Sequence, residues 1–217
     1  MPPENDQIFL VFANTSNMTC WHNLRFTKSI MSSGFAAAAS DPEFRDAYIR
    51  GTANYAPFVP NTARTTGFVS LFAMQAASQY EIEYDAEYLR YHEFPTLPSR
   101  LSAVYAFGRA EDTRRAHDLY HWDLSTLRRF RLIRDPLARV HRANMEIVSL
   151  MRSVYPRASW SREDRDNIWR HYWSGGGSLK VEIPVIREGA PHRQWFESGE
   201  IWEHLIEGRL QLLDEND

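Results

Sequence analysis

Segments with the pattern of β-strands lie near both ends of this chain, and helical patterns fill most of the residues between them. The run from Gln7 to Phe12 is compact and apolar, which is typical of a buried strand. Residues 179–185 alternate between apolar and polar side chains, as a strand with one buried face does. Two further strands are expected over 200–206 and 209–213, around Glu207 and Gly208. The sequence therefore predicts an α+β fold, with strands at both chain ends and helices between them.

The middle of the chain carries helical periodicity interrupted by one apolar strand-like run. A short helix is expected at 42–50, and one long helix or two broken ones at 69–91. Residues 101–107 are patterned as a strand, and Gly108 leads from it into a helix at 110–119.

Capping residues predict three further helix boundaries. A short helix over Phe26–Met31 is expected to stop at Ser33 and Gly34. Asp135 followed by Pro136 is a strong helix start, and apolar residues at helical spacing continue from there to Val154. Ser161 and Asp164 resemble a capping box for a helix that ends near Trp173.

Length and composition favour one globular domain. The chain has 217 residues, of which 43% are hydrophobic, enough for a packed core. We expect a single domain over 1–217, with a helical insertion around 36–95 and a second helical segment around 135–173. One cysteine, Cys20, excludes an internal disulfide and a thiolate metal cage. No apolar run approaches the roughly 20 residues of a membrane span, and the polar start is unlike a signal peptide. We therefore expect a protein without membrane partners that is cytoplasmic, or that acts in a host cytoplasm if it is a toxin or effector.

The basic residues are almost all arginine, and they are unevenly placed. Of 25 basic residues only Lys28 and Lys180 are lysines. Residues 100–170 hold 15 Arg against 9 acidic residues, although the whole chain has a net charge of −3. Two interpretations stay open: solvated arginine faces on helices, or a basic surface for a phosphate-bearing ligand or an acidic partner.

Common catalytic motifs are absent from the sequence. There is no P-loop, no Gly-x-Gly-x-x-Gly run and no Gly-x-Ser-x-Gly elbow, so a P-loop nucleotidase, a Rossmann dehydrogenase and an α/β-hydrolase have no support. His117 and His121 are four residues apart, but no carboxylate completes a metal-binding pattern. We expect two ordinary histidines and no metal site.

Short patterns along the chain, taken in order, carry a family resemblance. They are Val11–Ser16 at the end of the first strand, Ser29–Phe35, Ser99–Phe107 leading into the helix from Ala110, and Glu200–Gly208 before the closing strand. Their order resembles the ADP-ribosyltransferase superfamily, in which a late strand carries a catalytic Glu before Leu-x-x-Gly. Three stretches are similar to a little-characterised bacterial or phage branch: Phe94–Arg100, Tyr172–Trp173 and Trp202–Leu205. The resemblance spans about residues 8–213 and implies a split β-sheet core with helices inserted.

The resemblance implies a site that takes NAD as substrate. Cleavage of the nicotinamide–ribose bond builds positive charge on the sugar, and a fixed carboxylate stabilises that charge. Glu203 best matches the family's catalytic position, with Glu200 as the second candidate. Arg100 is a candidate to grip the pyrophosphate, and Tyr105, Trp122 and Trp173 are candidates to stack on a ring. The predicted NAD-binding residues are Thr15, Ser16, Arg100, Ser102 and Tyr105, and Ser70 is a further candidate for the family's serine.

Two departures from the family pattern keep an alternative open. Ala13 stands where the family has His, and Asn14 stands where it has Gly. In the family the His usually binds the adenosine ribose, and this chain lacks that side chain. The sequence therefore supports an ADP-ribosyltransferase or NAD glycohydrolase with an unknown acceptor, protein or nucleic acid. The alternative is an inactive binding protein of the same fold that engages an acidic or nucleotide-like partner. A nucleic-acid binder using arginines 114, 115, 128, 129 and 131 is a weaker third hypothesis, because the net charge is negative.

Overall fold

The computed structural model describes residues 7–55, 80–154, 161–187 and 190–213. The helices are α1 (Met18–Phe26), α2 (Ser33–Ser40), α3 (Pro42–Ile49), α5 (Tyr80–Glu93), α6 (Ala110–Tyr120), the short η2 (Leu124–Thr126), α7 (Met145–Val154) and α8 (Arg162–Trp173). The strands are β1 (Ile8–Phe12), β2 (Ser29–Met31), β3 (Val104–Ala106), β4 (Leu127–Leu132), β5 (Arg139–Asn144), β6 (Lys180–Arg187), β7 (Ala190–Glu197), β8 (Trp202–Glu207) and β9 (Arg209–Leu212). The chain is therefore α+β, as the sequence predicts.

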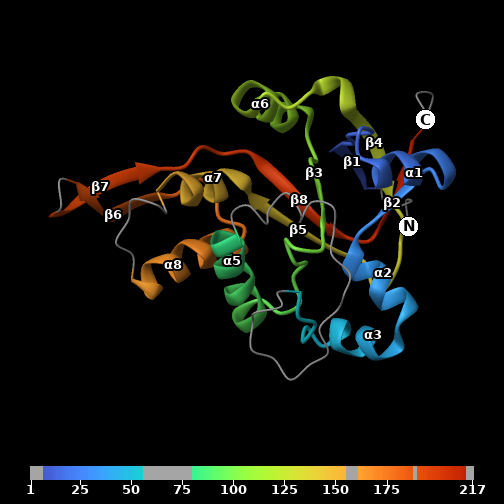
Figure 1. The fold of residues 1–217 in the computed structure, drawn as a ribbon, viewed down its shortest axis with the longest axis horizontal. Helices are drawn as coiled ribbons and strands as arrows, with labels where there is room; N and C mark the ends of the chain where they lie inside the picture. The colour runs from blue at the N-terminus through green and yellow to red at the C-terminus, as the bar shows by residue number, and fades with distance from the viewer. Residues whose placement is uncertain (1–6, 56–79, 155–160, 188–189, 214–217) are drawn as a thin grey trace, which may run out of the picture.

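Antiparallel strands form two sheets and a separate hairpin (Figure 1). One sheet has four strands in the order β1-β4-β9-β2, and the other has three in the order β3-β8-β5. An isolated bridge between Leu10 of β1 and Phe107, just after β3, links them. The β6–β7 hairpin extends away from both sheets.

Two apolar layers hold the sheets in place. On one face of the three-stranded sheet, α5, α7 and α8 enclose a core that includes Trp169, Trp173 and Leu205, each at most 1% exposed. The opposite face packs against the four-stranded sheet through a second core, in which Val104 and Ile206 meet Val11 and Phe130. Strand β8 thus lies between the two cores, which explains why its side chains are mostly buried.

Side-chain caps fix two helix starts at the positions that the sequence predicts. Asp41 accepts hydrogen bonds from the amides of Glu43 and Phe44 and begins α3. Ser161 and Asp164 form the reciprocal capping box expected for α8, which ends at Trp173. The strands expected at 7–12, 179–185, 200–206 and 209–213 are confirmed as β1, β6, β8 and β9.

The helix predicted over Phe26–Met31 is wrong. Asn17 caps a helix that starts earlier, at Met18, and Lys28 takes a left-handed conformation with φ of 52°. Residues 29–31 are then free to pair with β9 as β2. Ser33 and Gly34 begin α2, because the Ser32 side chain caps it, rather than ending the preceding helix.

The helix predicted from Asp135 is also wrong over its first half. Asp135 caps only one turn, through the amide of Leu137 at 2.8 Å. Arg139–Asn144 then pair with all six residues of β8, so strand pairing overrides the helical spacing. The helix begins at Met145 as α7.

The sequence predicts one strand in the middle of the chain, at 101–107, and β3 lies within it; β4 and β5 are two further strands there that the sequence does not predict. The segment expected as helix at 69–91 is described from Tyr80 onward, as α5, and Ser70 lies outside the described residues. Within the described ranges, no helix is both long enough and apolar enough to cross a membrane.

Candidate functional site

Arg100 is the centre of a buried ion cluster beneath the three-stranded sheet. Its Nε and Nη2 donate to the two carboxylate oxygens of Glu83 on α5, at 2.8 and 3.2 Å. Its Nη1 donates to Oε1 of Glu203 on β8 at 2.7 Å and to the hydroxyl of Tyr172 on α8 at 2.5 Å. The Tyr172 hydroxyl in turn donates to the same Glu203 oxygen at 2.8 Å. Helix α5, helix α8 and strand β8 thus meet at one guanidinium.

Two further side chains complete this cluster. Arg152 on α7 donates to Glu83 at 3.3 Å, so two arginines face two carboxylates. The Tyr105 hydroxyl on β3 donates to the backbone oxygen of Arg100 at 2.8 Å, and the Arg100 guanidinium lies 5.1 Å from the Tyr105 ring centre. Tyr105 therefore orients Arg100 from the sheet side.

Charge pairing keeps Glu83 ionised despite its burial. Burial opposes ionisation of Glu83, but Arg100 and Arg152 outweigh it and hold the pKa of this carboxyl below its usual value. Burial, with the nearby Glu203 charge, raises the pKa of Tyr172 well above its usual value despite the opposing charge of Arg100, so Tyr172 stays a neutral hydrogen-bond donor. The side chains of Arg100 and Glu203 are each only 5% exposed.

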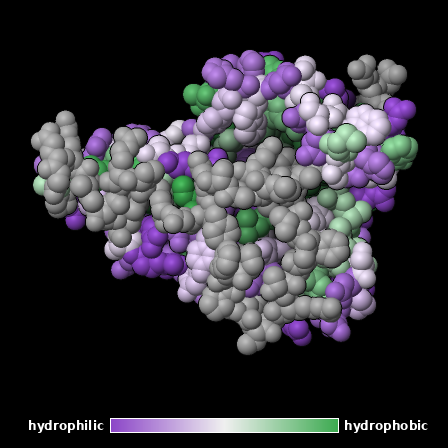
Figure 2. Space-filling model, in the orientation of Figure 1, coloured by the Kyte–Doolittle hydropathy of each residue, from purple (hydrophilic) through white to green (hydrophobic). Residues whose placement is uncertain are grey.

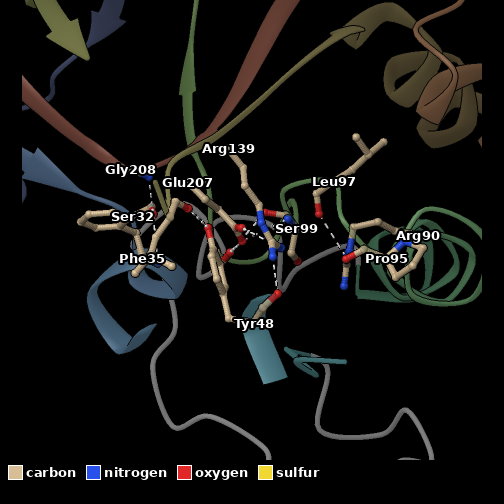
Figure 3. A network of polar contacts seen from close by, with 12 residues as sticks. Ser32, Phe35, Tyr48, Arg90, Pro95, Leu97, Ser99, Arg139, Glu207 and Gly208 are labelled. Atoms are coloured by element: carbon tan, nitrogen blue, oxygen red, sulfur yellow. Dashed lines mark hydrogen bonds and ion pairs between the residues drawn. The ribbon is translucent and has the colours of Figure 1, made fainter. Parts of the chain in front are cut away.

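A second buried network surrounds Glu207, four residues further along β8 (Figure 3). Oε1 of Glu207 accepts the amide of Ser99 at 3.2 Å and the hydroxyl of Ser102. Arg139 approaches Oε2 at 3.9 Å while its guanidinium lies 3.8 Å from the Tyr48 ring centre. Burial, with the Glu207 charge, raises the pKa of Tyr48.

The two networks join through the loop before β3 and through helix α5. Ser99 donates its hydroxyl to Glu87 at 2.7 Å, and Glu87 forms a paired ion contact with Arg90. Glu83 and Glu87 are four residues apart and therefore lie on one face of α5. Ser99 and Arg100 thus contact Glu87 and Glu83 of α5, and they also contact Glu207 and Glu203 of β8 directly.

The structure brings four of the predicted site residues into these two networks and leaves three outside. Glu203, Arg100 and Tyr105 belong to the first network and Ser102 to the second. Glu200 is exposed and bonds to the indole of Trp202 at 2.6 Å. Thr15 and Ser16 lie in an exposed turn after β1, where Asn14 binds the Ser16 amide.

The candidate stacking residues are used for packing. Trp173 is 1% exposed and donates its indole N–H to the backbone of Ala86. Trp122 packs edge-on against Phe12 and Phe107. These contacts give both rings a structural role.

Sequence reasoning missed Glu83 and Arg152 in the first network and, apart from Ser102, the members of the Glu207 network. Glu83, Glu87 and Arg90 follow one another at helical spacing just before the Pro-Ser-Arg run, and this was the available signal. Arg152 carried no local signal, because only the tertiary fold brings α7 to α5.

The described residues contain no group of three or more His, Cys, Asp or Glu side chains that could hold a metal ion. His117 binds the backbone oxygen of Trp122 at 2.7 Å, and His121 takes a left-handed conformation at the end of α6. The two histidines therefore terminate a helix.

The opposite face of β8 carries a half-buried histidine. His204 packs edge-on against Phe9, with 5.2 Å between ring centres, and a Cβ added at Gly108 would lie 2.8 Å from its ring. Burial, followed by the charges of Arg142, His141 and Arg109, lowers the pKa of His204 to about 4. This histidine is neutral near pH 7.

Comparison with models of known protein families finds no match, and a search of curated proteins finds none either. The site is therefore defined by its own geometry. That geometry offers a buried carboxyl group, Glu203, oriented by one guanidinium and one phenol.

Proposed function

We propose that this protein uses NAD as substrate and transfers ADP-ribose to an acceptor or to water, with Glu203 as the carboxylate that faces the ribose. The observation that carries this proposal is the convergence of Arg100 and Tyr172 on one oxygen of Glu203. A carboxylate held in this way has a fixed direction, which the stabilisation of a developing cation requires.

The strand arrangement supports the proposal. Two antiparallel sheets meet at the Leu10–Phe107 bridge, and a sheet divided in two is what the family resemblance leads us to expect. Glu203 lies on β8, the central strand of its sheet, in the last part of the chain, as the family's catalytic Glu does.

The chemistry assigns different tasks to the residues of the cluster. As the bond between nicotinamide and ribose breaks, positive charge on the sugar is stabilised by the Glu203 carboxylate. Oε1 is engaged by Arg100 and Tyr172, so Oε2 is the oxygen offered to the ribose 2′-hydroxyl. Because Nε, Nη1 and Nη2 of Arg100 all donate to protein oxygens, we assign Arg100 to positioning Glu203 rather than to gripping the pyrophosphate.

An inactive binding protein of the same fold is the second candidate function. It is favoured by the burial of Glu203, whose side chain is 5% exposed, together with Ala13 at the family's His position. In this case the Arg100 cluster serves only to hold the core together, and NAD has no effect on thermal stability.

Incubation with labelled NAD, alone and in a lysate, tests the enzyme proposal. We expect consumption of NAD or a labelled product with the wild-type protein, and loss of both with Glu203→Gln. Glu200→Gln is the matched control, since it removes an exposed carboxylate three residues away. No consumption and no labelled product, with wild type and Glu203→Gln behaving alike, would rule the enzyme out.

Thermal unfolding with and without NAD separates the two candidates. Stabilisation of wild type by NAD counts against the second candidate, because a ligand stabilises only the state that binds it. A salt-sensitive complex with an acidic partner, unaffected by NAD, favours it.

A further inference from the structure

Two arginines in the ion cluster around Glu203 differ in exposure. Arg100 is 5% exposed, and its Nε, Nη1 and Nη2 all donate to protein oxygens. Arg152 on α7 is 40% exposed. Its Nη2 donates to Glu83 at 3.3 Å, and its Nε and Nη1 have no hydrogen-bond partner among the described residues. Arg152 therefore retains donors for a ligand, whereas Arg100 does not.

Arg152 lies on the solvent side of this cluster. Glu83, which is 1% exposed, accepts from Arg100 on both carboxylate oxygens and from Arg152 on Oε1. Arg100 continues the series of contacts to Glu203. Polar groups thus run without interruption from an exposed guanidinium to the buried carboxyl group that is proposed to face the ribose.

Two phenol groups lie within range of the Arg152 charge. Burial raises the pKa of Tyr105 on β3 and of Tyr120 on α6, and the charge of Arg152 opposes both rises. Tyr120 is tied to α7 by hydrogen bonds between its hydroxyl and the side chains of Glu146 and Ser149. Arg152 therefore lies near the contact between α6 and α7 as well as near the Glu203 cluster.

Few carboxylates compete for Arg152. Glu83 is shared with Arg100, and Glu146, six residues earlier on α7, is about 9 Å away along the helix axis. The undescribed segments 56–79 and 155–160, which adjoin α5 and α7 in the chain, contain no Asp or Glu. Figure 2 shows hydrophilic residues over α6 and α8, the helices that flank α7 in this view. The surface around Arg152 therefore suits a polar, anionic ligand.

We propose that Arg152 binds the diphosphate of NAD beside the Glu203 site. In the dinucleotide a phosphate is attached to the same ribose that Glu203 is proposed to face, so a cation is required close to the cluster. Guanidinium groups bind phosphate through paired N–H donors, and burial leaves Arg100 unsuited to this task. The assignment rests on the proposed function, because it takes the ribose to lie at Glu203.

Isothermal titration calorimetry with NAD, ADP-ribose and nicotinamide riboside tests the proposal. The first two ligands contain the diphosphate, and nicotinamide riboside contains no phosphate. Arg152→Gln should weaken the binding of NAD and ADP-ribose about tenfold to a hundredfold, as expected for loss of a hydrogen bond to a charged group. The binding of nicotinamide riboside should change by less than about twofold. An equal loss for all three ligands would mean that Arg152 only supports the shape of the cluster, and would overturn the proposal.

Arg162→Gln is the matched control. Arg162 on α8 is 41% exposed and pairs with the buried Asp85 of α5 at 3.7 Å, so the substitution removes the same charge from a similar setting. It should leave the binding of all three ligands within about twofold of wild type. Equal weakening of NAD binding by Arg162→Gln and Arg152→Gln would reduce the effect to net charge and contradict the assignment.

Turnover separates the role of Arg152 from the proposed function. In Arg152→Gln the KM for NAD should rise while kcat stays within about twofold, since binding common to the ground state and the transition state is lost. Diphosphate-dependent binding at Arg152 without release of nicotinamide would contradict the proposed function alone. Nicotinamide release that requires Glu203, with NAD binding unchanged in Arg152→Gln, would contradict the role of Arg152 alone. Failure of the wild-type protein to bind NAD or ADP-ribose would refute the role of Arg152 as well.

Arginine modification keeps the proposal testable if Arg152→Gln does not fold. Phenylglyoxal reacts with exposed guanidinium groups, and mass spectrometry measures the modification of each arginine. ADP-ribose added to the wild-type protein should slow the modification of Arg152 but not of Arg162, and nicotinamide riboside should slow neither. Modification of Arg152 at the same rate with and without ADP-ribose would contradict the proposal.

Discussion

Arg100 and Glu203 form a 2.7 Å ion pair although 103 residues separate them, and each side chain is only 5% exposed. This contact joins the loop before β3 to the central strand β8. It also places a full positive charge against the proposed catalytic carboxylate. The pair therefore has to serve both the stability of the sheet and the orientation of Glu203.

Replacement of Arg100 by Met should destabilise the protein strongly. Glu83 and Glu203 would remain buried without their shared partner, and loss of one member of a buried ion cluster costs about 3–5 kcal/mol. Urea denaturation measures the change. Arg115→Met is the control, because Arg115 pairs with Glu111 at the surface and should cost less than about 1 kcal/mol. If Arg100→Met lowered the free energy of unfolding by less than about 1 kcal/mol, the structural role of Arg100 would be contradicted.

Tyr172→Phe should separate the orientation of Glu203 from the binding of NAD. It removes the hydroxyl that bridges Arg100 and Glu203 but keeps the ring in the core. NAD turnover should fall about tenfold, with little change in KM. A tenfold fall is the lower end of the loss of activity expected when a residue that orients a functional group loses its hydrogen bond. Tyr105→Phe, which removes the hydroxyl that donates to the Arg100 backbone, should retain most of the turnover. Equal loss in the two variants would contradict the role of Tyr172.

Gly34→Ala should destabilise the protein even though it lies in a helix. A Cβ there would lie 2.7 Å from the Tyr55 hydroxyl, 2.9 Å from Oγ of Ser102 and 3.0 Å from Oε1 of Glu207. Helix propensity alone favours Ala by about 1 kcal/mol, whereas overpacking costs about 1–3 kcal/mol. Gly177→Ala, which meets only the exposed Glu200 side chain, should be nearly neutral. Stabilisation by Gly34→Ala would show that the Glu207 network is loosely packed.

His204 should make stability fall as pH decreases from about 6.5 to 4. Its folded-state pKa is lowered to about 4 by burial and by the charges of Arg142, His141 and Arg109. In that window the unfolded chain binds a proton that the folded chain does not, so protonation favours unfolding. The melting temperature of His204→Asn should depend less on pH over this range than that of wild type. His192→Asn, on exposed β7, should follow wild type; identical profiles for all three proteins would refute the assignment.

Local patterns in the sequence predicted the elements that are stabilised locally. The capping box at Ser161 and Asp164 and the alternation in β6 were sufficient for α8 and for that strand. Strand β5 was misread as helix, because its conformation depends on pairing with β8, some 60 residues later. Strands β4 and β7 were not predicted at all.

The candidate site follows the same division. The resemblance singled out Glu203, Arg100, Ser102 and Tyr105, and the fold brings all four into two linked networks. Glu83 and Arg152 could not be assigned from sequence, because helix packing alone brings α5 and α7 to Arg100. Thr15 and Ser16 were expected beside them but lie in an exposed turn.

Release of nicotinamide from NAD, measured by chromatography under single-turnover conditions, tests the central claim most directly. Wild type should release nicotinamide, Glu200→Gln should do so within about twofold, and Glu203→Gln should be slower by about a hundredfold to a thousandfold. The wild-type protein and both variants should bind NAD. Equal release by wild type and Glu203→Gln, or release by neither while both remain folded, would contradict the assignment of Glu203 as the catalytic carboxylate.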